Sequence, residues 1–339
     1  MIVHIVESTA TGTLAMLRLA ANSQIESGPV KVIYSRRPET PANLEALFDP
    51  RIKLVNVQMG SLTEKVSAAM EIRKIVKSSK LKAVFLHSSF AGFIGRIALL
   101  FDNTPVFYLP HCISFMRKDI TGVKSLAFKL LEWVGSVKKA TYVACSYSEG
   151  DEIKKSVPFR KCVVVENAVN TDSWNSSEWA SKENVVVTVG QIRLQKDPQR
   201  FAEIAKQILS KKNNIRFVWV GDGEDEAKKV LQDAGVEVVG WKTPDEVKNY
   251  LSDSRYYLST ALWEGMPVSP IEAMLSGCVA ILSDCAGNVD IVSDKNTGFL
   301  FSGVTDAVLR IEEILAGKYD LEEISVRGTG HCAENYNIS

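Results

Sequence analysis

We predict an α/β fold with two Rossmann-like domains, and three observations support this prediction. At 339 residues the chain is longer than one hydrophobic core usually organises. Short apolar runs rich in β-branched residues alternate with amphipathic stretches, which is typical of parallel sheets covered by helices. The alternation stops once, in the polar stretch 166–184, and then begins again. Because ligands bind beyond the carboxyl ends of parallel strands, we expect the two domains to face each other across a cleft.

The first half of the chain contains short runs with the composition of buried strands. Helical periodicity falls between them and is clearest over residues 62–79, where apolar residues recur every three or four positions. The candidate strands are 2–7, 30–34, 53–57, 83–87, 105–109, 141–145 and 162–166.

The second half repeats this alternation after a linker. Residues 166–184 are rich in Asn and Ser and have no period, so we place the linker there. We set the N-terminal domain at 1–168 and the C-terminal domain at 169–318. Residues 319–339 are a short tail, for which a path back to the first domain is one option. The candidate strands are 184–190, 215–221, 236–240, 255–260, 279–283 and 297–301.

Composition argues against several classes of protein. The start, MIVHIVESTATG, has no basic segment followed by a long apolar run, so we expect no signal peptide. No run of about 18 apolar residues occurs, so we expect no membrane span. The six cysteines include no CxxC pair and the four histidines have no ligand spacing, which indicates reduced thiols, a cytoplasmic location and no metal site.

Charge is divided unequally between the halves. Residues 1–170 carry 23 lysines and arginines against 14 acidic residues, a formal charge of +9, and residues 171–339 carry 17 against 26, or −9. The first half therefore faces something anionic. Nucleic acid is not expected, because no basic stripe interleaved with aromatics occurs. The basic and apolar stretch 115–139 is either an ordinary amphipathic helix on the sheet or a surface that contacts anionic lipid. The charge of this half favours the lipid interpretation.

The stretch WEGMPVSPIEAM holds two glutamates with two interpretations each. Ser269, Pro270 and Glu272 have the spacing of N-cap, N1 and N3, so Glu272 either completes a capping box or accepts both hydroxyls of a ribose. Glu264 is either a solvated loop carboxylate or an acceptor for sugar hydroxyls. Backbone N–H groups of the turn and of the helix start can hold phosphates without a metal. The turn residues are Gly265, Met266 and Pro267.

Two further segments follow strands of the second domain. In VGQIRLQKDPQ, Arg193 and Lys196 precede a helix that opens at Asp197. They are either solvated cations beside a capped helix or groups that stabilise charge on a departing phosphate. In VGDGEDE, the glycines beside Asp222 either let the backbone approach a ligand or form a plain turn. Neither segment is a GxGxxG fingerprint, which argues against a dinucleotide coenzyme.

Three segments of the first domain contribute candidates. Gly12 and Thr13 lie where the first strand gives way to a helix, and are either a simple capped turn or a loop that approaches ligands. His111 directly follows a strand, in FYLPHCISF, and His87 ends the preceding strand. Each histidine is either a structural hydrogen-bonding group or a residue of the cleft.

Several of these motifs also occur together in one known family. Glu264 and Glu272 are separated by seven residues, VG…K-D-P and VGDG precede them, and GNVDIVSDKNTGFLF follows. In the first half, LHSSFAGFIGRIA, SYSEGDEI and ENAVN are similar to acceptor-domain signatures. The chain thus resembles the retaining nucleotide-sugar glycosyltransferases of family four, which have the GT-B fold. The resemblance covers roughly residues 1–315.

The resemblance implies a role for each candidate. Lys196 and Arg193 grip the donor diphosphate, Glu272 holds the ribose and Glu264 the transferred sugar, while Gly12 and Thr13 approach the diphosphate and acceptor. His111 corresponds to an acceptor-domain histidine near the sugar, so His111 and Glu264 are the catalytic candidates. The family often has arginine where this chain has Gln191. Either Arg193 replaces that arginine or phosphate binding is weaker than usual.

The expected function is that of a retaining, metal-independent glycosyltransferase without a cofactor. It moves a hexose or N-acetylhexosamine, from a UDP-sugar in preference to GDP-mannose, to a polyprenyl-diphosphate-linked glycan in O-antigen or capsule biosynthesis. This chemistry takes place on the cytoplasmic face of the inner membrane, where an anionic surface is a further partner. One alternative is a non-catalytic nucleotide-binding partner of a glycosyltransferase, which Gln191 suggests. The other is a sugar-nucleotide epimerase of the same fold, which is not expected to carry the two glutamates.

Overall fold

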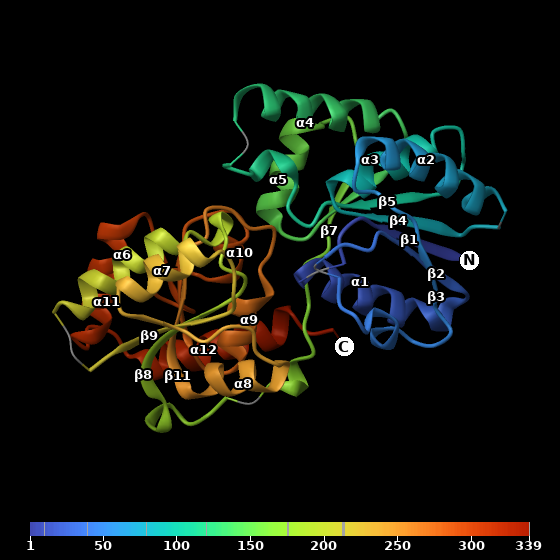
Figure 1. Cartoon of the computed structure of the whole chain (residues 1–339). Coiled ribbons are helices and arrows are strands. Elements are labelled where there is room, and N and C mark those ends of the chain that lie inside the picture. The colour runs from blue at the N-terminus through green and yellow to red at the C-terminus, as the bar shows by residue number, and fades with distance from the viewer. Residues whose placement is uncertain are drawn as a thin grey trace. The chain divides into compact units, whose positions relative to one another are not determined.

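The chain folds into two compact units, each of which is described by itself. The computed structural model describes residues 1–9, 11–38, 40–78, 80–119, 121–174, 176–211 and 214–338. The units are Met1–Glu166 and Asn167–Ser339, so the division falls two residues before the boundary we set from the sequence. Each unit is a parallel sheet covered by helices (Figure 1), which confirms the predicted fold class.

The described residues of the first unit form a seven-stranded parallel sheet in the order β3-β2-β1-β4-β5-β6-β7. Each strand lies within a predicted range, because the apolar runs are continuous and bounded by turn residues. The strands are β1 (Ile2–Val6), β2 (Val30–Tyr34), β3 (Lys53–Asn56), β4 (Ala83–His87), β5 (Val106–Leu109), β6 (Thr141–Ala144) and β7 (Cys162–Val164). The helices are α1 (Thr11–Gln24), α2 (Leu62–Lys77), α3 (Ser89–Ala98), α4 (Gly122–Gly135) and α5 (Tyr147–Ser156), with short 3-10 turns at Ile25–Ser27, Leu44–Leu47 and Ser114–Met116.

Both faces of the first sheet are buried, and strand alternation divides the core between them. Side chains of successive strand residues point to opposite faces. Ile2 and Val6 therefore pack with Leu17 of α1, whereas Val3 and Ile5 pack in the cluster that includes α2 and α3. Figure 1 shows α1 on one side of these strands and α2 and α3 on the other.

The second unit holds a six-stranded parallel sheet in its described residues, in the order β10-β9-β8-β11-β12-β13. This is the strand order of a Rossmann fold. The strands are β8 (Glu183–Val189), β9 (Arg216–Val220), β10 (Val236–Val238), β11 (Ser254–Ser259), β12 (Val279–Ser283) and β13 (Phe299–Phe301). The helices are α6 (Pro198–Leu209), α7 (Asp225–Asp233), α8 (Pro244–Asp253), α9 (Val268–Leu275), α10 (Asn288–Ile291), α11 (Val304–Leu315) and α12 (Leu321–Asn335), with 3-10 turns at Thr171–Ser173, Trp179–Ser181 and Leu194–Lys196.

The C-terminal tail is an ordered part of the second unit. The segment 319–339 forms α12, which packs on α9 and β12. Thr329 Oγ1 donates to the Met274 carbonyl at 2.7 Å. The Val169 amide donates to the Tyr336 carbonyl at 2.8 Å, so the end of the chain is joined to the beginning of this unit. None of the helices in the described ranges is long and apolar enough to cross a membrane.

Strand order fixes where each unit can hold a ligand. The order reverses between β1 and β4 in the first sheet and between β8 and β11 in the second. At such a reversal the connections that follow neighbouring strands run to opposite faces, which leaves a crevice at the carboxyl edge. In the first unit this edge carries the start of α1 and the end of β4. In the second unit it carries the loops that follow β8 and β11.

Candidate functional site

Lys196 and Glu264 meet at the strand-order reversal of the second unit. Lys196 ends the loop after β8, Glu264 belongs to the loop after β11, and Lys196 Nζ lies 2.8 Å from Glu264 Oε1. Their side chains are only 14% and 9% exposed. Burial opposes the charge of Lys196, but Glu264 and Tyr257 favour it more strongly, so the pKa of Lys196 is raised above its usual value. The site therefore holds a permanent cation at the carboxyl edge of the sheet.

Hydrogen bonds join the two loops into one surface. The Leu262 amide donates to the Gln195 carbonyl at 2.8 Å, and Thr260 Oγ1 donates to the Lys196 carbonyl at 2.7 Å. Gln195 Nε2 donates to Glu264 Oε2 and to the Trp263 carbonyl, both at 3.0 Å. Because Glu264 contacts an ammonium and an amide at once, its carboxylate has one fixed orientation. The solvated-loop interpretation of Glu264 is therefore wrong.

The turn after Glu264 is held by a close backbone contact. A Cβ atom on Gly287, whose φ is +83°, would lie 2.7 Å from the Gly265 carbonyl oxygen. The Met266 carbonyl accepts a hydrogen bond from Asn167 Nδ2 at 2.7 Å. Pro267 is the N-cap of α9 and supplies no capping side chain. The first amides of α9 therefore have no side-chain cap.

Glu272 does not form the capping box that its spacing suggested. The helix α9 begins at Val268, one residue before the predicted N-cap, so Glu272 lies in its second turn. The Ser269 hydroxyl instead accepts a hydrogen bond from the Tyr257 hydroxyl at 2.9 Å. Within the described residues the Glu272 carboxylate makes no hydrogen bond or ion pair. Burial raises the pKa of Glu272 to about 7, with Lys248 opposing weakly. A half-buried carboxylate without a partner is suited to a ligand with hydroxyl groups.

The Arg193 side chain is free to bind a ligand at the same sheet edge, whereas that of Asp222 is already paired. The Arg193 side chain is exposed, has no hydrogen bond or ion pair to the described residues, and lies near enough to Lys196 to repel its charge. Asp222 pairs with Lys228 at 2.9 Å. A Cβ on Gly221, whose φ is +147°, would lie 2.0 Å from the Gly190 carbonyl oxygen. The VGDG segment is thus a turn packed on the β8 loop, as the plain-turn interpretation predicted.

In the first unit, Gly12 and Thr13 lie in the first turn of α1. Gly12 is exposed, and a Cβ atom there would meet no described atom within 4 Å. Thr13 is half-buried. The amides in the first turn of a helix have no partner within that helix and carry a partial positive charge, and α1 opens beyond the carboxyl end of β1. This turn is therefore open to an anionic ligand.

His111 ends a chain of three hydrogen-bonded histidines. His111 Nε2 lies 2.9 Å from His87 Nδ1, and His87 Nε2 lies 2.9 Å from His4 Nδ1. His4 Nε2 contacts Gln24 Oε1 of α1, also at 2.9 Å. Burial lowers the pKa values of His4 and His111 to about 4 and that of His87 well below its usual range. All three rings are therefore neutral at physiological pH.

Glu149 fixes the loop that carries His111, a role the sequence did not reveal. Its Oε1 accepts the amides of Cys112 and Ile113 at 2.8 and 2.7 Å, and its Oε2 accepts the Cys145 amide at 2.8 Å. His111 and Cys112 have φ values of +55° and +108°, which non-glycine residues rarely adopt. A fully buried carboxylate thus stabilises a strained backbone at the end of β5. Sequence reasoning also missed His4, whose only signal is a polar residue in an apolar strand, and Gln24, an ordinary polar residue at the end of α1.

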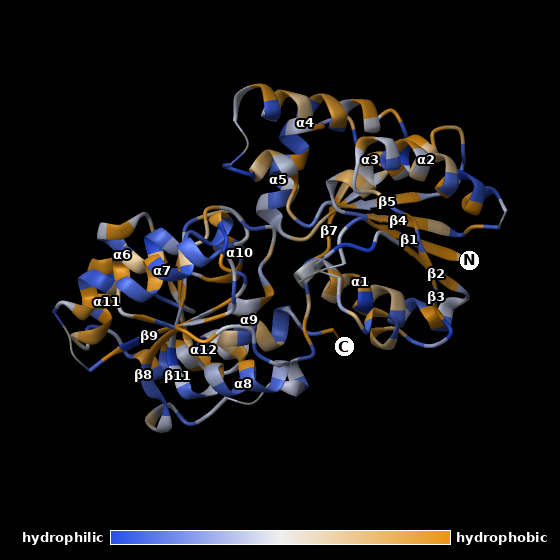
Figure 2. Cartoon of the chain, viewed as in Figure 1, coloured by the Kyte–Doolittle hydropathy of each residue, from blue (hydrophilic) through white to orange (hydrophobic). Residues whose placement is uncertain are grey.

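The helix α4 buries one charged residue, Glu132, and exposes most of its large apolar residues. Glu132, only 5% exposed, forms an ion pair with the fully buried Arg96 at 2.6 Å. Figure 2 shows several hydrophobic, orange segments along α4. Five apolar side chains of this helix are more than half exposed: Val123, Leu126, Leu130, Trp133 and Val134.

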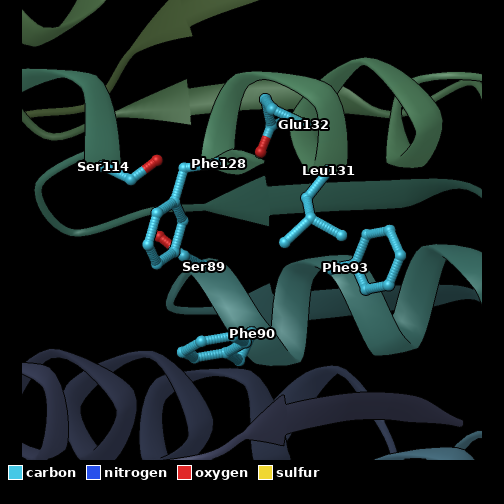
Figure 3. A pocket seen from close by; sticks show the side chains of 7 residues that line it. All are labelled: Ser89, Phe90, Phe93, Ser114, Phe128, Leu131 and Glu132. Carbon is cyan, nitrogen blue, oxygen red and sulfur yellow. The ribbon is translucent and has the colours of Figure 1, made fainter. Parts of the chain in front are cut away.

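A small, mostly apolar pocket lies between α3 and α4. Figure 3 shows side chains of both helices around it, among them the phenyl rings of Phe90 and Phe128. The pocket is lined by Ser89, Phe90, Phe93, Ser114, Phe128, Leu131 and Glu132. None of the three histidines is among its lining residues.

Comparisons with known proteins match the two units of the chain to two family models. The family model described as "Glycosyltransferase Family 4" matches residues 16–173, and the one described as "Glycosyl transferases group 1" matches residues 170–329. The UDP-Gal:alpha-D-GlcNAc-diphosphoundecaprenol alpha-1,3-galactosyltransferase of Escherichia coli is 31% identical over 266 residues, which cover 71% of this chain and 67% of that protein. The chain belongs to this family of glycosyltransferases.

Solved structures show that this glycosyltransferase has the GT-B fold. Sucrose-phosphate synthase from Thermosynechococcus elongatus superposes with a TM-score of 0.83 at 14% identity, covering 99% of this chain and 95% of that one. HepE from Anabaena, in complex with UDP-glucose, gives a TM-score of 0.80 at 14% identity over 99% and 96% of the chains. The O-antigen biosynthesis glycosyltransferase WbnH of Escherichia coli is 25% identical over 78% of this chain and 77% of its own length.

Proposed function

We propose that this glycosyltransferase is retaining and independent of metal ions. It transfers a hexose or N-acetylhexosamine from a UDP-sugar to a polyprenyl-diphosphate-linked oligosaccharide in O-antigen or capsule biosynthesis. The observation that carries the proposal is the Lys196–Glu264 pair beside the unpartnered Glu272 at one sheet edge. The names of the Escherichia coli galactosyltransferase and of the HepE complex support the lipid-linked acceptor and the uridine donor.

Each group of the donor site has a role that its chemistry suits. Glu272 accepts the two ribose hydroxyls, and the uncapped amides of α9 contact the diphosphate. Lys196 and Arg193 stabilise the charge that develops on the leaving diphosphate. Glu264, oriented by Lys196 and Gln195, accepts hydroxyls of the transferred sugar. Metal independence is proposed because these cations and amides supply the positive charge that a metal ion would otherwise provide.

The reaction is a front-face substitution at the anomeric carbon. An acceptor hydroxyl oxygen forms the new bond to this carbon on the side from which the diphosphate departs. The bond from the carbon to the diphosphate oxygen breaks, and its electron pair stays on that oxygen. The hydroxyl proton moves to the same oxygen, so the products are an α-linked glycan and a nucleoside diphosphate. His111 and Gly12 belong to the acceptor side of this step.

The exposed face of α4 suits a peripheral contact with an anionic membrane. Its apolar residues are accompanied by Lys124 and Lys129, both exposed, while its buried side is occupied by the Arg96–Glu132 pair. Apolar residues together with lysines favour the interface of an acidic bilayer. A location on the cytoplasmic face of the inner membrane brings the enzyme to a polyprenyl-linked acceptor.

A transfer assay tests the catalytic claim. The purified chain is incubated with UDP-galactose, UDP-glucose, UDP-N-acetylglucosamine or GDP-mannose and a synthetic GlcNAc-diphosphate-lipid, and products are analysed by mass spectrometry and by NMR of the anomeric proton. We expect an α-linked product from one UDP-sugar in the presence of EDTA, and loss of transfer in Glu264→Ala. A β-linked product, or strict dependence on added metal, would contradict the mechanism.

The exposed Gln191 favours one second candidate, a non-catalytic nucleotide-binding partner of another glycosyltransferase. That candidate predicts nucleotide binding without sugar transfer or UDP release for any of these donors and acceptors. A Gln191→Arg variant with unchanged transfer would show that Arg193 already supplies the phosphate contact. A sugar-nucleotide epimerase would instead convert the UDP-sugar to its epimer without an acceptor.

A further inference from the structure

We propose that His4, His87 and Gln24 are positioning residues that fix the tautomer of His111. In this arrangement His111 Nδ1 carries a lone pair, and the ring presents a hydrogen-bond acceptor to a hydroxyl group bound at the carboxyl edge of the first sheet. Its use by a sugar or acceptor hydroxyl rests on the proposed function. The assignment of the tautomer rests on the structure alone.

His4, His87 and His111 have six ring nitrogens between them, and five of these have hydrogen-bond partners. His4 and His87 use both nitrogens, and His111 uses Nε2. His111 Nδ1 has no partner among the described residues. His4 and His87 are fully buried, whereas His111 is half-buried. The unused nitrogen therefore lies on the one ring that a ligand can reach.

The order of protons along the chain follows from the neutral state of the rings. A neutral imidazole has one N–H donor and one acceptor nitrogen. Gln24 Oε1 is an acceptor, so His4 Nε2 carries the proton and His4 Nδ1 accepts. His87 Nε2 then donates to His4, and His87 Nδ1 accepts from His111 Nε2. The proton of His111 is thereby placed on Nε2, which leaves the lone pair on Nδ1.

The position of the His111 ring is restrained from two directions. On one side, the rings of His87 and His111 stack with centroids 5.2 Å apart and an interplanar angle of 11°. On the other side, Glu149 holds the amides of Cys112 and Ile113 directly after it. The strained φ of +55° at His111 persists because both restraints act on the same loop. A ring held in this way keeps Nδ1 in one place.

A spectroscopic test reads the tautomer directly, without any sugar transfer. In the full chain labelled with 15N-histidine, we expect His111 Nδ1 to have the shift of an unprotonated, pyridine-type nitrogen and Nε2 that of an N–H. The reverse pattern would overturn the proposal. If transfer fails for every donor but this pattern is found, the proposed function is lost and the positioning role remains.

Two nearly isosteric variants of His4 separate positioning from packing. Asn offers an acceptor oxygen near the position of His4 Nδ1, so His4→Asn should keep the tautomers of His87 and His111. His4→Leu removes this acceptor, so His87 is no longer held in one tautomer. We expect kcat for transfer to be about fivefold to tenfold lower in His4→Leu than in His4→Asn, with equal KM for the donor. Equal kcat values, or a faster leucine variant, would show that His4 only packs.

Gln24→Met is a milder variant at the other end of the chain. Gln24 is half-buried at the last turn of α1, so the melting temperature should stay within about 2 °C of wild type. Without the acceptor oxygen, we expect the His111 shifts to move toward an average of the two tautomers. Unchanged shifts would show that Gln24 does not set the order of protons.

Discussion

Lys196 Nζ and Glu264 Oε1 lie 2.8 Å apart, although 68 positions separate the residues along the chain. The parallel order of β8 and β11 brings their loops to one edge, and the loop-to-loop hydrogen bonds hold them there. Because the Lys196 ammonium is paired with the Glu264 carboxylate, it is ordered and charged before a diphosphate binds. This pair connects the fold of the second unit to the proposed chemistry.

Lys196→Met should damage both stability and transfer. It leaves Glu264 nearly buried without its charge partner, so we expect the free energy of unfolding in urea to fall by about 1–3 kcal/mol. Transfer should fall by about a hundredfold or more, because a group that stabilises the leaving diphosphate is lost. The double variant Lys196→Met/Glu264→Gln removes both charges and should regain most of the stability without regaining transfer. Restored transfer in the double variant would refute the role given to the pair.

Glu272→Gln should change the pH dependence of stability. Burial raises the pKa of Glu272 from 4.5 to about 7, so between these pH values the folded state binds the proton more tightly than the unfolded state. Wild-type stability should therefore fall relative to Glu272→Gln as the pH rises from 5 to 8, by about 1–3 kcal/mol. Urea unfolding at pH 5, 6, 7 and 8 measures the difference. A constant difference would show that Glu272 is ionised throughout.

Gly221, directly after β9, and Gly12, in the first turn of α1, should respond differently to substitution by alanine. At Gly221 a Cβ atom would lie 2.0 Å from a carbonyl oxygen and φ is +147°, so Gly221→Ala should destabilise the second unit by about 3 kcal/mol or more. At Gly12 the same atom meets no atom of the described residues within 4 Å, so Gly12→Ala should change stability by less than about 1 kcal/mol. If the α1 turn contacts the reactants, transfer should fall about tenfold in Gly12→Ala. Wild-type transfer activity in Gly12→Ala would show that Gly12 does not contact the reactants.

Acidic substitutions on α4 test the membrane contact. Leu126→Glu combined with Leu130→Glu should reduce co-sedimentation with vesicles of phosphatidylglycerol and phosphatidylethanolamine by about tenfold or more, since both side chains are more than half exposed. UDP affinity serves as the control, because the donor residues all belong to the second unit. Binding that persists, or that does not weaken with salt, would argue against an electrostatic lipid contact.

Sequence patterns predicted the strands well because buried parallel strands are continuous apolar runs. The edge of the second sheet was also predictable, since Lys196 and Glu264 both follow such strands. The register of α9 was not. Ser269 and Pro270 have the spacing of an N-cap and N1, but the helix begins two residues earlier than that spacing predicts. The Ser269 hydroxyl accepts a hydrogen bond from Tyr257 of β11. The local capping pattern of Ser269 was therefore misleading, because its hydroxyl bonds to a residue of a neighbouring strand and not to the start of the helix.

The first unit shows a second kind of limit. His4 is a single polar residue in the run IVHIV, and its partners lie 83 and 20 positions away. No spacing rule connects residues that meet only through the order of strands in a sheet. The exposed face of α4 has a similar origin, because the buried Arg96–Glu132 pair turns its apolar side outward.

Nucleotide binding to wild type and Glu272→Ala, by calorimetry in EDTA, tests the donor site most directly. The titrants are UDP, GDP and ADP. We predict that UDP binds wild type more tightly than the other two, and that its affinity falls about a hundredfold or more in Glu272→Ala, because two charge-assisted hydrogen bonds to the ribose are lost. Tight UDP binding that survives the substitution, or that requires added metal, would contradict the donor site described for this glycosyltransferase.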